Sequence, residues 1–523
     1  MTAPLPQSLP DDIDVLKTLL LKKEQCLLQK EQRIHLLEEQ IRLFKQKRFG
    51  TSSEKSDQQV ELFNEAELEE AVQQVLEPDE TEIAASSPTV PVVRQAKPGR
   101  KPLPADLPRV RVEHDIPDAD KVCACGCERE CIGEDTSEQL DIIPAKVQVL
   151  VNVRKKYACK QCEANVTTAA LPPQPIPKSK ASPGLLAHIA VAKYQDALPL
   201  YRQEVILGRS DIDLPRNTLA LWMVKAGELV QPLINLLQDS LLSYPVLQCD
   251  ETTVQVLKEP GKEAESNSYM WVRVGGPPTQ PIRLYHYADS RRGEVAEQLL
   301  TGYRGYVQTD DYAGYNGACS QKGITQLGCW AHARRKFVEA QKAAGKQKKT
   351  GKADVAVNMI AKLYAIEKRA KMMTPEERHT LRQTESLPQL DSLRKWLDKT
   401  LRTTLPKGLL GKALGYLDKN WDKLTVYTQD GRLSIDNNLA ENAIRPFVVG
   451  RKNWLFSAST SGAKASANLY SLIETAKANG LEPYTYLKRV FAELPRVQGL
   501  REIESLLPWQ IPPQDSPALK ATS

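Results

Sequence analysis

The stretch Tyr244–Leu257, YPVLQCDETTVQVL, constrains the fold more than any other part of the chain. Its β-branched and apolar residues predict a strand. Asp250 and Glu251 lie in the middle of this run. A carboxylate inside a buried strand is unfavourable unless its charge is compensated, and a bound metal ion is one such compensation. The other interpretation is that the strand ends at Cys249 and that both acids lie in a solvated turn.

Further elements follow this stretch in a definite order. The pattern predicts two strands, a helix and two more strands: Tyr269–Gly275, Ile282–Tyr287, Gly293–Tyr303, Gly305–Thr309 and Thr325–Trp330. The order resembles the ribonuclease-H-like fold, in which the first strand carries one metal-binding acid and the fourth strand ends on another. Those acids correspond here to Asp250 and Asp310. Asp311 follows directly and is expected to point elsewhere.

A third acid is expected on a later helix. The segment Ser434–Phe456 has helical spacing, with Ser434 or Asp436 as a candidate cap. Glu441 and Arg445 share a helix face at i, i+4 spacing, and Pro446 is expected to end or kink the helix. Taken alone, Glu441 fits an exposed helix acid paired with Arg445 better than a metal ligand, and the sequence around it favours the ligand.

Three segments resemble the transposases of the insertion sequence 66 family. They are DNNLAENAIRPFVVGRKNWLFS, TDDYAGY at Thr309–Tyr315 and CWAHARRKF at Cys329–Phe337. The resemblance implies a DDE recombinase with the triad Asp250, Asp310 and Glu441 as ligands of Mg²⁺ or Mn²⁺. One departure exists, because Asp311 stands where the family usually has Gly after its second Asp.

The charge distribution favours a polyanionic partner. The net charge is only +6, but the segment from 56 to 93 contains acids and no Lys or Arg, so the remainder of the chain is more basic than the average indicates. The acidic segment is also consistent with a solvated linker. With no run of 18 apolar residues and no signal-peptide pattern, we expect a cytoplasmic, nucleoid-associated protein without membrane contact.

The N-terminal segment 12–47 predicts a coiled coil. Apolar residues fall on two heptad positions: Ile13, Leu20, Leu27, Ile34 and Ile41 on one, and Leu16, Leu37 and Phe44 on the other. A self-association helix of this kind would give a homodimer or a higher oligomer. An amphipathic helix packed on its own domain is the other interpretation.

The chain has ten cysteines and no signal-peptide pattern, so we expect free thiols or metal ligands rather than disulfides. The pair Cys159 and Cys162 has the two-residue spacing of a zinc knuckle. The family resemblance suggests that Cys123 and Cys125 complete a structural Zn²⁺ site with them, and Cys127 is a competing ligand. The run Val147–Tyr157 reads as a strand between the halves of a zinc ribbon, and free thiols are the alternative.

Two further regions carry candidate DNA contacts. Helices predicted between 182 and 222 have helix-turn-helix spacing, with Arg216, Asn217 and Thr218 near the start of the second helix. A plain helical hairpin explains that spacing equally well. Cations and aromatics near the acids form the other candidate set: His332, Arg334, Arg335, Arg445, Arg451, Lys452 and Trp454.

Two of these residues have other interpretations. His332 forms a Cys-x-x-His pair with Cys329, which could be a ligand half-site or a structural hinge. Trp454 could stack on a flipped base or lie in the core.

The sequence thus predicts a multidomain α+β protein. We expect a coiled-coil helix, an acidic and Pro-rich linker, a zinc ribbon, a helix-turn-helix region, and a ribonuclease-H-like core split by a helical insertion before its C-terminal tail. The expected bounds are 1–55 for the coiled-coil helix, 56–108 for the linker, 109–178 for the zinc ribbon and 179–240 for the helix-turn-helix region. The core comprises 241–337 and 431–495, the insertion 338–430 and the tail 496–523. The predicted function is a transposase acting on double-stranded DNA, aided by small accessory proteins of the same element; a DNA-binding regulator or scaffold on an inactive fold is the alternative.

Overall fold

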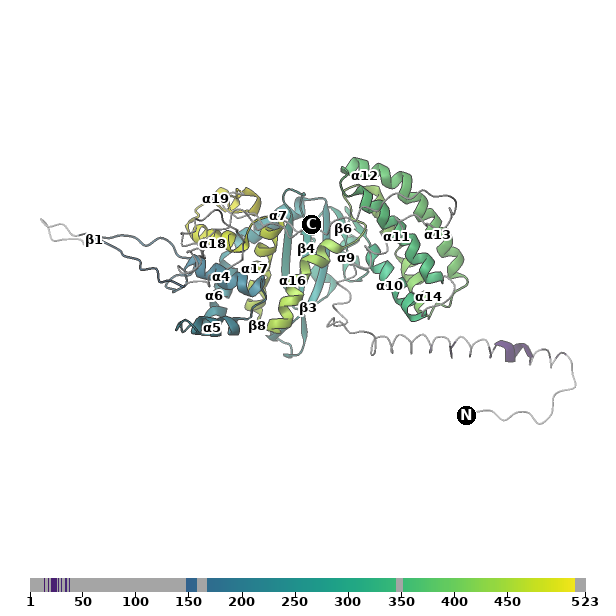
Figure 1. Ribbon diagram of the computed structural model, residues 1–523, viewed down its shortest axis with the longest axis horizontal. Coiled ribbons are helices and arrows are strands. Elements are labelled where there is room, and N and C mark those ends of the chain that lie inside the picture. The colour runs from purple at the N-terminus through teal and green to yellow at the C-terminus, as the bar shows by residue number, and fades with distance from the viewer. Residues whose placement is uncertain are drawn as a thin grey trace, which may run out of the picture. The chain divides into compact units, whose positions relative to one another are not determined.

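The computed structural model describes residues 14, 17, 20–25, 27, 30, 33–34, 37, 147–157, 167–344 and 351–512 (Figure 1). The chain divides into two compact units, Asp79–Leu171 and the remainder, Met1–Pro78 with Pro172–Ser523. The described residues between 14 and 37 are helical, and Leu20, Leu27 and Ile34 are exposed. This helix agrees with the expected secondary structure, and the coiled coil itself stays a prediction.

A mixed sheet is the centre of the larger unit. Its strands run in the order β5-β4-β3-β6-β7, with β8 beside the far end of β3. The bounds are β3 Val246–Lys258, β4 Asn267–Gly275, β5 Ile282–Ala288, β6 Gly305–Gln308, β7 Ile324–Leu327 and β8 Phe456–Ser459. β3, β4 and β5 are antiparallel neighbours, whereas β6, β7 and β8 join in parallel. The predicted mixed α+β class is confirmed.

The strand register leaves one edge of β3 open in its middle. β6 pairs with β3 only as far as Gln248, opposite Gln308. β8 begins to pair with β3 at Gln255. The segment of β3 between Gln248 and Gln255, which includes Asp250 and Glu251, therefore has no strand on that side in the described part of the chain.

Helices pack on the sheet around one hydrophobic core. Before the sheet come α4 Pro183–Tyr194, α5 Leu200–Gly208, α6 Arg216–Leu229 and α7 Gln231–Ser243; within it lie α8 Gly293–Leu299 and α9 Tyr315–Cys319. After it come α16 Asn438–Trp454, α17 Thr460–Ala478, α18 Pro483–Glu493, η4 Leu494–Arg496, α19 Leu500–Glu504 and η5 Pro508–Gln510. Figure 1 shows α16 across β3 and β4. α6 approaches α17 so closely that a Cβ on Gly227 would lie 2.6 Å from the Ala465 Cα.

A second group of helices lies between β7 and α16 and has its own hydrophobic core. Its elements are α10 Trp330–Ala344, α11 Lys352–Ala370, α12 Pro375–Leu381, η2 Arg382–Ser386, α13 Leu387–Leu401, α14 Leu409–Lys419, α15 Trp421–Thr425 and η3 Val426–Gln429. Helices thus occupy the segment 338–430 in which the sequence predicts a helical insertion, and the domain bounds stay a prediction.

Three local expectations need correction. The fifth strand ends at Leu327, and Trp330 begins α10 because its side chain is fully buried in the second core. Pro446 does not end α16, which continues to Trp454 with Phe447 and Val448 buried against the first core. Pro215, which is of a residue type suited to the first turn of a helix, is instead the N-terminal cap of α6.

The expected ribbon strand is also shorter than predicted. Within 147–157 only β1, Lys156–Tyr157, is a strand, paired antiparallel with β2, Thr167–Thr168. The zinc-ligand candidates Cys123, Cys125, Cys127, Cys159 and Cys162 lie outside the described residues. No helix among the described residues is both long and apolar enough to cross a membrane.

Candidate active site

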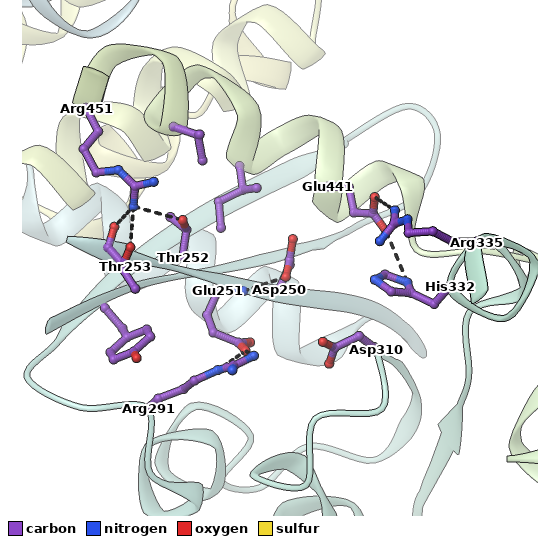
Figure 2. A pocket seen from close by; sticks show the side chains of 13 residues that line it. Asp250, Glu251, Thr252, Thr253, Arg291, Asp310, His332, Arg335, Glu441 and Arg451 are labelled. Atoms are coloured by element: carbon purple, nitrogen blue, oxygen red, sulfur yellow. Dashed lines mark hydrogen bonds and ion pairs between the residues drawn. The ribbon is translucent and has the colours of Figure 1, made fainter. Parts of the chain in front are cut away.

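A polar pocket opens at the free edge of β3, between the ends of β6 and β8 (Figure 2). Segments that are distant in the sequence line it: the middle of β3, the start of β4, the turns after β5 and β6, the first two turns of α10 and one face of α16. The lining residues are Asp250, Glu251, Thr252, Thr253, Tyr269, Arg291, Asp310, His332, Arg335, Glu441, Ile444, Val448 and Arg451.

The three acids expected from the sequence all line this pocket. Asp250 comes from β3, Asp310 from the turn directly after β6, and Glu441 from the first turn of α16. Asp310 accepts the backbone N–H of Tyr312 at 2.9 Å, which orients its carboxylate. Asp311 does not line the pocket, and its carboxylate pairs with Lys419 Nζ at 3.1 Å. This arrangement agrees with the assignment of the motif position to Asp310.

The pocket concentrates negative charge. Burial raises the pKa of Asp250 well above its ordinary value, and the charges of Glu251, Glu441 and Asp310 raise it further. Burial and the charge of Asp310 also raise the pKa of Glu251. Like charges that are close together in a desolvated site repel each other, so a cation bound among them would be stabilising. Asp250, Asp310 and Glu441 thus bring three carboxylates from separate elements to one pocket.

Glu251 points away from Asp250 and is neutralised separately (Figure 2). Its Oε1 lies 2.5 Å from Arg291 Nη2, and its Oε2 accepts the Tyr315 hydroxyl at 2.5 Å. Arg291 in turn lies 3.7 Å from the centroid of the Tyr312 ring. The sequence displays the Asp-Glu pair, but it gives no signal that Arg291 and Tyr315, which are 40 and 64 residues further along the chain, are the partners of Glu251.

Glu441 lies against the start of α10. His332 Nδ1 is 3.6 Å from Glu441 Oε1, and Arg335 Nη2 is 3.9 Å from Oε2. The side chain of Glu441 is only 13% exposed, so it is not the solvated helix acid that was the other interpretation. Burial and the charges of Arg335 and Lys336 lower the pKa of His332 to about 3, so its imidazole is neutral at neutral pH.

Cys329 brings a sulfur close to the same place. Its Sγ and ligand atoms of His332 and Glu441 all lie within 4.8 Å of one another. However, the thiol is fully buried, its pKa is well above the ordinary value because of that burial, and its sulfur accepts the backbone N–H of Asn437 at 3.3 Å. Through this hydrogen bond Cys329, the residue next to the start of α10, contacts the N-terminal cap of α16.

The basic residues predicted as DNA contacts occupy different environments. Arg451 lines the pocket and donates to the hydroxyl groups of Thr252 at 3.1 Å and Thr253 at 2.8 Å. Arg335 also lines it. Arg334 is only 5% exposed and is therefore buried in the protein, contrary to the expected surface contact.

Trp454 lies at the edge of the core, as one of its two interpretations expected. Its ring meets the Phe447 ring edge-on at 5.4 Å, and Lys193 Nζ lies 5.1 Å from its centroid. Arg445 is half-buried and Lys452 is exposed on the same helix. These contacts leave base stacking by Trp454 as a prediction.

The helix-turn-helix candidates lie away from this pocket. Arg216 and Asn217 are exposed in the first turn of α6, and Thr218 is half-buried. The backbone N–H of Arg216 donates to Glu204 of α5 at 3.1 Å, which connects the two helices.

Family models match most of the chain. Residues 178–465 match the model described as "Transposase IS66 family", and residues 471–509 match the "IS66 C-terminal element". Residues 120–163 match the "zinc-finger binding domain of transposase IS66", and residues 36–112 match a model described as "Transposase C of IS166 homeodomain". The zinc-finger match covers all the zinc-ligand candidates.

Relatives of similar length occur in Sinorhizobium fredii. One, described as "Uncharacterized protein y4qI", is 30% identical over 545 residues, which cover 97% of this chain and 98% of the relative. A second, "Uncharacterized protein y4jD", is 33% identical over 78% of this chain and 81% of its own length. The match at 178–465 spans the sheet, the pocket and the helical insertion, and the chain therefore belongs to the IS66 family of transposases.

Proposed function

We propose that this transposase is a DDE enzyme, which binds the ends of an insertion sequence and catalyses metal-dependent DNA strand cleavage and strand transfer. The convergence of Asp250, Asp310 and Glu441 on one pocket carries the proposal. Under it, the sheet with the order β5-β4-β3-β6-β7 is a ribonuclease-H-like catalytic core. Helices α10–α15 interrupt that core before its third acid.

Mg²⁺ or Mn²⁺ is the cofactor that suits this pocket. Burial and three neighbouring acids raise the pKa of Asp250, and a divalent cation would offset that repulsion. Carboxylate oxygens are the hard ligands that Mg²⁺ prefers. When bound, a metal pair supplies activation of the attacking oxygen and stabilisation of the leaving oxygen in an in-line displacement at phosphorus. Asp250, Asp310 and Glu441 would hold the pair.

The chain's own cations bind and orient the double-stranded DNA. Arg335 and Arg451 line the pocket, which supports their contact with the phosphates next to the scissile bond. His332, Arg445, Lys452 and Trp454 extend this surface, and Arg216, Asn217 and Thr218 contact the transposon end at a second place. Arg334 is left out because it is buried.

The remaining parts of the chain assemble the reaction. A Zn²⁺ ion on Cys123, Cys125, Cys159 and Cys162, with Cys127 as the competing ligand, would stabilise a ribbon. The N-terminal helix would join copies as a homodimer or higher oligomer, because transposition brings two DNA ends together. Accessory proteins of the same element and a cytoplasmic, nucleoid-associated location complete the proposal.

Single substitutions test the triad. Asp250→Asn, Asp310→Asn and Glu441→Gln should each abolish Mg²⁺-dependent cleavage and joining of an end substrate while end binding persists in a gel-shift assay. Asp311→Asn is the matched control, because Asp311 pairs with Lys419 outside the pocket, and it should cleave normally. Cleavage that survives in all three variants would refute the triad. An unaltered protein that binds ends but never cleaves would be a regulator or scaffold, and cleavage without joining would indicate an ordinary nuclease.

A further inference from the structure

Three buried side-chain amides lie within four residues, in the sequence, of the three acids expected as a triad. Gln248 precedes Asp250 by two residues on β3, Gln308 precedes Asp310 by two residues, and Asn437 is the N-terminal cap of the helix that carries Glu441. Their exposed fractions are 4%, 1% and 1%. A buried amide is unfavourable unless its polar atoms find partners, so the partners of these three define what they do.

Gln248 and Gln308 join the two strands that end on acids. Gln248 Nε2 donates to Gln308 Oε1 at 2.9 Å. Gln308 Nε2 donates to two carbonyls, Gly328 at 3.1 Å and Ser434 at 3.0 Å. Gly328 precedes α10 and Ser434 precedes α16. One side chain therefore connects the end of β6 to both helices that meet at Glu441.

The same amides bind the start of α16 to β3. Gln248 Oε1 accepts the backbone N–H of Ala440 at 3.3 Å, next to Glu441, and Gln248 Nε2 donates to the Asp436 carbonyl at 3.2 Å. Asn437 Nδ2 donates to the Cys249 carbonyl at 2.9 Å, next to Asp250. Each of these bonds crosses 188 or more residues of sequence.

We propose that Gln248, Gln308 and Asn437, here called the amide clamp, are positioning residues that fix the separation of Asp250, Asp310 and Glu441 and thereby set the affinity of the pocket for divalent cations. This inference rests on the proposed function. Because alternate residues of a strand share a face, Gln248 and Asp250 lie on the same side of β3. Mg²⁺ demands near-ideal octahedral geometry, so small shifts among the three acids weaken its binding. Groups that orient metal ligands are typically worth about 10–100-fold in metal affinity or activity.

Gln308→Met tests the clamp, because Met is close to Gln in size and cannot make any of its three amide hydrogen bonds. We expect the Mn²⁺ concentration for half-maximal thermal stabilisation of the full chain to rise about tenfold. The Mn²⁺ midpoint of cleavage should rise equally, with much of the rate restored at saturating Mn²⁺ and end binding unchanged. A purely structural role would lower the rate at every Mn²⁺ concentration without moving either midpoint.

Gln203→Met is the matched control. Gln203 is also a buried glutamine, 4% exposed, whose Nε2 donates to the Leu198 carbonyl at 3.0 Å, away from the pocket. It should lower the melting temperature but keep the Mn²⁺ midpoint of the unaltered protein. Gln248→Met replaces Gln308→Met if the latter does not fold, and its midpoint should shift in the same direction.

The clamp and the triad can fail separately. Asp250→Asn should remove most of the Mn²⁺-dependent stabilisation; if it leaves that stabilisation intact, the metal site itself is wrong. If Asp250→Asn removes it but a folded clamp variant keeps its Mn²⁺ midpoint within twofold of the unaltered protein, the clamp is refuted and the triad stands.

Discussion

The buried ion pair of the helical insertion supports a quantitative stability prediction. Arg382 is fully buried, and its guanidinium donates to both oxygens of Glu367, at 2.8 and 2.6 Å. It also donates to the carbonyls of Tyr427, Asp430 and Leu433, at 2.7 to 2.8 Å. Glu367 is the only carboxylate among these partners, so Glu367→Ala leaves the buried charge of Arg382 uncompensated.

Removing one partner of a buried pair typically destabilises a protein by about 3–5 kcal/mol. The Glu367 side chain is 14% exposed, so water can replace part of the lost interaction. We therefore expect Glu367→Ala to lower the free energy of unfolding by about 3 kcal/mol, the lower end of this range. Glu385→Ala is the matched control, because Glu385 pairs with Arg369 at the surface, where the two side chains are 37% and 48% exposed. We expect Glu385→Ala to lower the free energy of unfolding by only about 0–1 kcal/mol.

Urea denaturation of the full chain measures this difference. Trp330 is buried in the core of the insertion and Trp396 and Trp421 pack against it, so tryptophan fluorescence reports on its unfolding. Glu367→Ala should lower the urea midpoint much more than Glu385→Ala does, with similar slopes. Equal midpoints for the two variants would show that the buried pair is not worth more than a surface pair, and the reasoning would fail.

The remaining predictions concern the acids, the zinc ribbon and the N-terminal helix. The folded-state pKa of Asp250 is raised above its unfolded value, so ionisation of Asp250 destabilises the metal-free fold as the pH rises above the unfolded pKa. Asp250→Asn should therefore raise the melting temperature in EDTA at pH 7 but not at pH 3. An unchanged or lower melting temperature at pH 7 would contradict this reasoning. Cys159→Ser, or treatment with a strong chelator, should lower the zinc content measured by elemental analysis by about one Zn²⁺ per chain and make the ribbon sensitive to proteolysis. If the Cys159→Ser protein keeps its full zinc content, Cys159 is not a ligand. Leu20 and Leu27 are exposed on the N-terminal helix, so the double change to Gln should lower the oligomeric state in light scattering, and an unchanged mass would place self-association elsewhere.

The residues around the pocket differ in how far the sequence predicts them. Strand propensity and spacing are local properties, and they placed Asp250 within a strand and Asp310 at the end of another; the structure has Asp250 in β3 and Asp310 two residues after β6. The mixed α+β class followed from the same local patterns. The expectation for Pro446 failed because packing of Phe447 and Val448 in the core outweighs the missing N–H within α16.

Partners that depend on tertiary contact were not predictable in this way. The amides at Gln248 and Gln308 are ordinary strand residues in the sequence, and only the parallel pairing of β3 with β6 makes them neighbours. Arg291 likewise follows β5 without a distinctive pattern, yet it neutralises Glu251. Arg334 and Arg335 are adjacent in a basic run, and only the packing of α10 shows that the first is buried and the second lines the pocket.

The position of the helical insertion has a consequence during protein synthesis. Asp250 and Asp310 have been synthesised once the ribosome has passed β3, β6 and β7. Glu441 is synthesised only after the whole insertion between β7 and α16. The strand β8, which closes the far edge of β3, emerges later still. An unfinished polypeptide therefore lacks the third acid of the proposed triad, and under that proposal it cannot cleave nearby DNA until translation has passed the insertion.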